Sequence, residues 1–134
     1  MAGSNALEFL AEFSAITINF DAVSKRVIDV TTTLAARQAA FLELIYYGDP
    51  AVAKELVTNE MAISRDQRTG LTAMHMAIAR DDLGLVNSLI EHHARFETDS
   101  QGRLPSLFAL EVEAGEEVTD VVTRAEIRYL MRTT

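Results

Sequence analysis

Few residues of this 134-residue chain have the type and spacing that catalysis or metal binding requires. Cysteine is absent, which excludes a thiol nucleophile and a disulfide. No nucleotide-binding glycine loop, Gly-x-Ser-x-Gly or His-Glu-x-x-His sequence occurs. His75 most invites a catalytic interpretation, and the pair His92-His93 most invites a metal. Because adjacent helical residues point in different directions, we interpret His92-His93 as a solvated helix end.

The acidic pair Glu116-Glu117 is interpreted as part of a solvated loop rather than as a general acid and base. The motif search therefore predicts no catalytic residue, no metal site and no cofactor, and we expect that the protein is not an enzyme.

The charge and hydropathy of the chain restrict the classes of partner that it can bind. Twenty acidic and twelve basic residues give a net charge of −8, with no run of Lys or Arg, so a nucleic-acid partner is disfavoured. No segment approaches the roughly 20 apolar residues of a membrane span, and the N-terminus lacks the basic region of a signal peptide. We expect a cytoplasmic protein that does not bind membranes, and the lack of cysteine suits a reducing compartment.

Two helices are expected before any repeat. Residues 5–20 have an N-cap in Asn5 and an apolar stripe at helical spacing. Asp21 is expected to cap a second helix, whose stripe is Val23, Val27, Val30 and Leu34. The β-branched run at residues 31–33 predicts that this second helix is broken or strained near the run.

Residues 70–78 and 102–110 align at a period of 32, and residues 44–49 match a part of the same unit more loosely. This self-similarity predicts a stack of small helical units, none of which buries its apolar face alone. Each unit is expected to hold an inner and an outer helix; in the central one Thr72 caps the first and Asp82 the second. The polar segments between units end in Gly70 and Gly102, which can supply a positive φ.

The central copy also resembles a known family. Residues 70–77, Gly-Leu-Thr-Ala-Met-His-Met-Ala, resemble the Gly-x-Thr-Pro-Leu-His-x-Ala signature of ankyrin repeats. Residues 85–94 are similar to the outer helix of such a repeat and the turn after it. Gly48-Asp49 and the apolar residues that follow are similar to part of an earlier repeat. The resemblance covers about residues 36–134.

The chain departs from the family pattern at several positions. Ala73 stands in place of the signature proline, and Leu104 and Leu107 in place of threonine and histidine. His93 takes a position that is usually glycine, so we expect strain in that turn. Residues 113–119 are expected to be an insertion before the last helix.

The resemblance implies an all-α fold: an ankyrin-like stack of about three short, divergent repeats in residues 36–134. Residues 1–35 do not match and are expected to form a helical N-terminal extension. In the family signature the histidine and the threonine three residues before it form a hydrogen-bonded pair. The resemblance therefore implies a structural role for His75, bonded to Thr72, rather than a catalytic one.

The resemblance also implies which residues face the concave groove. They surround the turn glycines and follow the inner helices: Tyr46, Tyr47, Arg68, Thr69, Leu71, Ala79, Arg80, Ser100, Gln101, Arg103, Glu111 and Val112. Tyrosine and arginine are the side chains that binding hot spots favour, so Tyr46, Tyr47, Arg68, Arg80 and Arg103 are predicted to form one patch.

The expected function is non-catalytic binding of a partner protein, by a bacterial or viral adaptor or an inhibitor or immunity protein. Glu111 is expected to face the groove, and Glu113, Glu116, Glu117 and Asp120 are expected to form a flexible lip beside it that attracts a basic partner or merely keeps the end soluble. Three alternatives stay open. The chain is a small enzyme or ligand-binding protein with a pocket between the N-terminal helices and the repeats; residues 7–20 form a homodimer; or residues 1–35 bind the partner instead of capping the stack.

Overall fold

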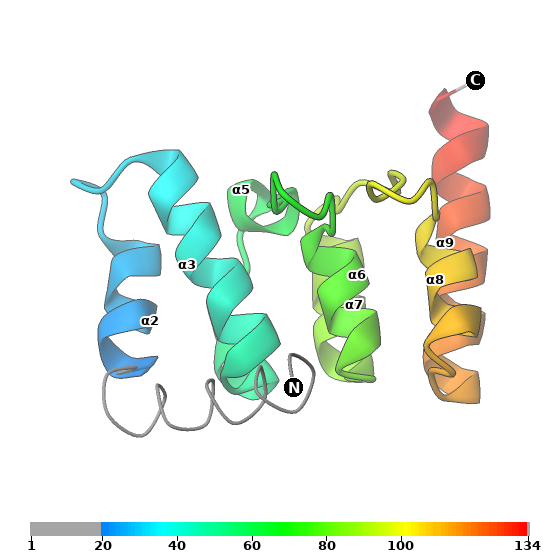
Figure 1. The fold of residues 1–134 in the computed structure, drawn as a ribbon, viewed down its shortest axis with the longest axis horizontal. Coiled ribbons are helices and arrows are strands. Elements are labelled where there is room, and N and C mark those ends of the chain that lie inside the picture. Colours follow the sequence, from blue (N-terminus) through cyan, green and yellow to red (C-terminus); the bar gives the residue numbers. More distant parts are fainter. Residues whose placement is uncertain (1–19, 134) are drawn as a thin grey trace, which may run out of the picture.

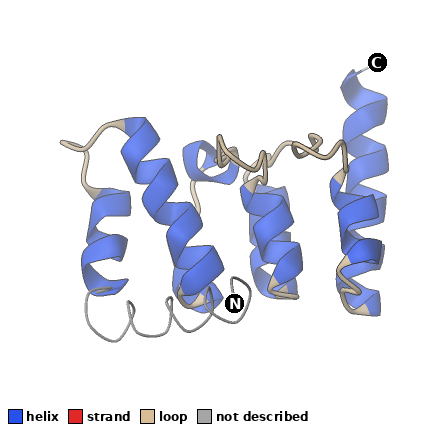
Figure 2. Ribbon diagram, in the orientation of Figure 1, coloured by secondary structure: helices blue, strands red, loops and turns tan. Residues whose placement is uncertain are grey.

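The computed structural model describes residues 20–133, which fold into helices joined by short loops (Figure 1). Figure 2 shows no strand in this part of the chain; one isolated bridge joins Arg65 to Thr72. The expected all-α class is thereby confirmed. The predicted helix over residues 5–20 and the dimer contact over residues 7–20 lie outside the described residues, except for Phe20.

The helices lie in two rows. In chain order they are α2 (Phe20–Ile28), α3 (Leu34–Tyr47), α4 (Pro50–Glu55), α5 (Asn59–Ala62), α6 (Ala73–Ala79), α7 (Leu83–Glu91), α8 (Pro105–Glu111) and α9 (Glu116–Thr133). One row is α3, α6 and α8, and the other is α4, α7 and α9; each helix contacts its neighbours in the row and its partner in the other row. None of these helices combines the length and the apolar character needed to cross a bilayer.

The break expected at residues 31–33 is confirmed, but the helix before it is shorter than predicted. α2 ends at Ile28, and Val30 is 83% exposed in the turn. The Asp29 carboxylate accepts hydrogen bonds from Thr31, and Thr33 caps α3 by accepting from the N–H of Ala36 (3.2 Å). Leu34 therefore begins α3 instead of ending α2. The expected domain boundary, between residues 35 and 36, falls inside the first turn of α3.

The prediction of an insertion over residues 113–119 is wrong. The turn after α8 is short and includes Glu113 in the left-handed region (φ 57°), and α9 begins at Glu116. Glu116 and Glu117 thus belong to the first helical turn, where carboxylates suit the positive end of the helix dipole. They form neither a loop nor a flexible lip.

His75 has the structural role that was expected. It is fully buried, and the N–H and hydroxyl of Thr72 lie 3.2 and 2.8 Å from its Nδ1. The Thr72 hydroxyl also accepts from the His75 N–H, which completes a capping box at the start of α6. Because Nδ1 accepts from the Thr72 N–H it carries no proton, so the ring is neutral and Nε2 donates to the carbonyl oxygen of Arg103 (2.9 Å). His75 therefore connects the loop before α6, through Thr72, to the loop before α8, through Arg103.

We expect this buried ring to make stability depend on pH. Burial lowers the pKa of His75, so below about pH 6.5 the unfolded chain takes up a proton that the folded chain does not. The free energy of unfolding should fall as pH drops from 7.5 to 5.5, by up to about 1.4 kcal/mol. Urea unfolding at the two pH values measures this loss. His75→Gln, which does not titrate here, should remove it; an equal loss in both proteins would contradict the assignment.

Candidate functional site

An open groove lies between α3 and the loop before α6. α3 has 14 residues and α6 only 7, so the first half of α3 extends past α6 to the level of the loops (Figure 1). The groove has a volume of about 610 Å³. Its α3 wall is Ala35, Gln38, Ala39, Leu42, Glu43, Tyr46 and Tyr47; its other wall is residues 65–69 with Leu71 and Met76.

The α3 wall is apolar along its centre. Ala35, Ala39, Leu42 and Tyr46 recur at intervals of four, three and four residues, which places them on one face of the helix. The small side chains of Ala35 and Ala39 leave this face open. Leu42 and Met76 are buried and form the floor. The groove can therefore take up apolar side chains of a ligand.

Tyr46 and Tyr47 lie at the end of this wall. Their rings meet edge to face with centroids 4.7 Å apart, and the residues are 43% and 41% exposed. Burial raises the pKa of Tyr47, with a smaller contribution from the neighbouring Tyr46, so the Tyr47 phenol stays protonated at neutral pH. The paired rings offer a rigid aromatic surface with two hydroxyl groups.

The opposite wall is a loop held by its own hydrogen bonds. The Asp66 carboxylate accepts from the hydroxyl (2.6 Å) and the N–H (2.9 Å) of Thr69, and these bonds lower the pKa of Asp66. The N–H of Gly70 donates to the Asp66 carbonyl (2.8 Å). Arg68 projects from this loop, is exposed, and makes no hydrogen bond or ion pair with any residue in the range 20–133. It is a cation available to a ligand.

The structure brings five of the predicted groove residues together: Tyr46, Tyr47, Arg68, Thr69 and Leu71 line the hollow. Arg80 does not line the hollow, but its Nη1 donates to the carbonyl oxygen of Tyr46 (3.0 Å).

Arg103, Glu111 and Gln101 do not line this groove. Arg103 is largely enclosed: it pairs with Asp99 (2.7 Å) and Glu111 (3.1 Å) and lies over the ring of Phe108, 4.8 Å from its centroid. Burial would raise the pKa of Asp99, but the hydrogen bonds from Arg103 and the N–H of Gln101 outweigh it and lower the pKa. Gln101 lies exposed at the tip of that loop. The single arginine patch that was predicted is thus divided, and Arg103 stabilises the loop.

Sequence reasoning missed a large part of the groove. The missed residues are Ala35, Gln38, Ala39, Leu42, Glu43, Arg65, Asp66, Gln67 and Met76. The signal that could have found the first five is the N-cap Thr33, followed by fourteen residues without Gly or Pro. These features indicate a long helix whose open face is part of the site.

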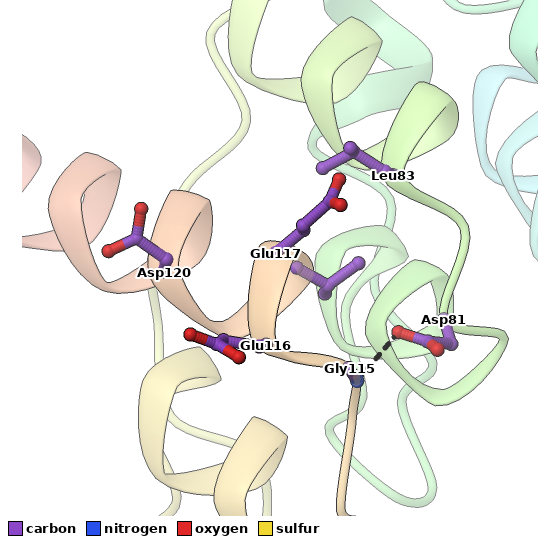
Figure 3. A pocket seen from close by; sticks show the side chains of 7 residues that line it. Asp81, Leu83, Gly115, Glu116, Glu117 and Asp120 are labelled. Carbon is purple, nitrogen blue, oxygen red and sulfur yellow. Dashed lines mark hydrogen bonds between the residues drawn. The ribbon is translucent and has the colours of Figure 1, made fainter.

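A second hollow, of about 710 Å³, lies at the opposite end of the helices, beside the turns before α7 and α9. It is lined by four carboxylates, those of Asp81, Glu116, Glu117 and Asp120 (Figure 3). Asp81 is engaged, because its Oδ1 accepts from the N–H of Gly115 (2.9 Å). Figure 3 shows the carboxylates pointing in different directions, and no group in the described chain has the arrangement of a metal site.

The histidine pair also lacks the geometry of a metal site. His92 caps the end of α7, where its Nδ1 lies 2.8 Å from the carbonyl oxygen of Ser88. His93 has a φ of 65°, which confirms the strain expected in that turn.

Comparisons of the chain with protein-family models, with curated proteins and with solved structures give no match. The groove along α3 therefore has to be understood from the residues that form it.

Proposed function

We propose that this protein binds a partner protein through the groove along α3 and catalyses no reaction. The observation that carries the proposal is the pair of exposed tyrosines in edge-to-face contact, which lines the groove together with the unpaired Arg68 and an apolar floor. Tyrosine and arginine supply large contact area or fixed donors with little loss of side-chain entropy, and they dominate binding hot spots. Both walls are held by hydrogen bonds, so a partner would have little to order on binding.

We further propose that the chain is an ankyrin-like stack. Equivalent geometry at a separation of 32 residues supports this: Gly70 and Gly102 have φ values of 73° and 78°, and Asp81 and Glu113 of 52° and 57°. The stepwise contacts within each row of helices have the nearest-neighbour pattern of a repeat protein. Such stacks act mainly by presenting a surface, which agrees with a binding function.

The charge of the protein favours a partner with a basic surface. The acidic hollow beside α9 and the net charge of −8 would accelerate the approach of such a surface and oppose a nucleic acid. The proposed role is that of a cytoplasmic adaptor, or of an inhibitor or immunity protein that covers a site on its partner.

Site-specific photocrosslinking tests the function. A benzoylphenylalanine at Tyr46 should crosslink a defined protein in extract of the source organism, and the same group at exposed Val52 on α4 should not. Once that protein is purified, Tyr46→Ala and Arg68→Ala should each weaken binding by about 2 kcal/mol in calorimetry.

Arg95→Ala is the matched control for Arg68→Ala, because Arg95 is also an exposed loop arginine but does not line the groove. Binding should be unchanged in this variant. If Tyr46→Ala and Arg68→Ala are as neutral as Arg95→Ala, the groove is not the binding site.

A further inference from the structure

A third hollow lies where α9 extends past the end of α7. α9 has 18 residues and α7 only 9, so the second half of α9 rises beyond its neighbours (Figure 1). The hollow has a volume of about 450 Å³, which is within the range of small-molecule sites. We call it the α7–α9 hollow. It is lined by Ile90, His93, Ala94, Phe96, Ala125, Arg128, Tyr129 and Arg132, none of which belongs to the groove along α3.

The floor of the α7–α9 hollow is apolar and partly aromatic. Ala94, Phe96 and Ala125 are buried. Tyr129 follows Ala125 by four residues, so it lies on the same face of α9. Its ring lies against that of Phe96, with centroids 5.5 Å apart. An aromatic group of a ligand can pack against these two rings.

Two unpaired arginines line the same hollow. Arg128 and Arg132 are four residues apart on α9, so their side chains are neighbours on one face of the helix. Both are exposed, and neither makes a hydrogen bond or ion pair with any residue in the range 20–133. Arg124, one turn earlier, is also exposed but pairs with Asp120 (3.2 Å) and does not line the hollow. The α7–α9 hollow therefore holds two cations that a ligand can engage.

The surroundings of the α7–α9 hollow favour an anion in spite of the net charge of −8. No acidic side chain is among its described lining residues. The carbonyl oxygen of Ile90, at the negative end of the α7 dipole, is engaged by the N–H of His93 (3.1 Å). Carboxylates farther away are screened, since the Debye length is about 8 Å at physiological ionic strength. The local charge is thus opposite to that of the whole protein.

We propose that the α7–α9 hollow binds a phosphate monoester whose ester group is an aromatic ring. Arg128 and Arg132 hold the phosphate, because guanidinium groups match phosphate oxygens bidentately and two cations match a dianion. The aromatic ring packs against Phe96 and Tyr129, and the imidazole of His93 is a further polar group at the site. A carboxylate would supply only one negative charge. A phosphotyrosine of another protein and a small aryl phosphate share the proposed chemistry.

Calorimetric titration of the full chain with phenyl phosphate tests the proposal. We expect saturable binding with a dissociation constant of about 0.01–1 mM. Inorganic phosphate lacks the ring and should bind at least about tenfold more weakly. Phenol lacks the charge and should show no saturable binding, because the arginines would then have no partner.

Substitutions in α9 locate the site. Arg128→Gln and Arg132→Gln should each weaken the binding of phenyl phosphate at least about tenfold, by removing a charged hydrogen bond. Arg124→Gln is the matched control, because it removes the same charge from the same helix outside the α7–α9 hollow. It should change the binding less than about twofold, since its charge is screened. Circular dichroism checks that each variant is folded.

A titration with a short peptide that carries phosphotyrosine between alanines distinguishes the two sources of the ligand. Binding as tight as that of phenyl phosphate, and weakened in Arg128→Gln, would identify a phosphorylated protein as the source. Binding of phenyl phosphate without binding of the peptide would identify a small aryl phosphate.

Three results would overturn the proposal. They are the absence of saturable binding of phenyl phosphate up to roughly 10 mM, inorganic phosphate that binds as tightly as phenyl phosphate, and an Arg124→Gln variant that binds as weakly as Arg128→Gln. Because partner binding is measured at the α3 groove with separate variants, failure here leaves the proposed function untouched.

Discussion

Gly70→Ala is expected to destabilise the fold by about 3 kcal/mol, through left-handed strain and overpacking together. Gly70 has a φ of 73°, and a β-carbon there would lie 2.5 Å from the backbone nitrogen of Ser100 and 2.7 Å from its hydroxyl. The two loops meet so closely because the N–H of Ser100 donates to the carbonyl of Thr69 (3.0 Å). Urea unfolding measures the loss.

Gly102→Ala is the matched control. Gly102 has nearly the same φ, 78°, but a β-carbon there would meet no atom within 4 Å. It should therefore cost only the backbone strain, about 1 kcal/mol. Equal losses in the two variants would show that the close approach of the loops at Gly70 does not exist in solution.

Ala77→Glu is expected to cost at least about 3 kcal/mol, because it buries a charge without a partner. Ala77 is fully buried on α6, the helix between α3 and α8. Thermal unfolding followed by circular dichroism should show a large fall in the melting temperature or no folded protein.

The control for this substitution is Ala79→Glu, which places the same side chain two residues later on an exposed position of α6. It should cost a few tenths of a kcal/mol, mainly by placing a carboxylate near the helix C-terminus. If Ala77→Glu melts like Ala79→Glu, α6 is not packed between its neighbours.

Several features set by local chemistry were predicted correctly, although Asp21, expected as an N-cap, lies within α2. Thr72, Asp82 and Gly70 act through their own turn or the next few residues, and the structure confirms the two caps and the positive φ. These interactions depend on residue type and short spacing, which a single sequence displays directly.

Features set by distant contacts were not predicted. Arg103 was expected at the binding surface, but Asp99 and Glu111 surround it, and nothing in the sequence tells a paired arginine from a free one. The groove exists because α3 is twice as long as α6. The apolar spacing through Val30 and Leu34 instead assigned both residues to the preceding helix, so the true start of α3 was missed. The division between α2 and α3 is a local feature that was missed, because Asp29 and Thr33 decide it through hydrogen bonds to residues two and three positions along the chain.

The hydrogen bond between Thr69 and Ser100 joins backbone atoms only, and any residue except proline can supply its N–H. The spacing of the two loops is therefore insensitive to the side chains at their tips, such as Gln67, Arg68 and Gln101. These positions can change in evolution without altering the frame that holds them. Descendants of this chain could acquire new partners by substitution at the tips alone, while Gly70 stays invariant beneath them.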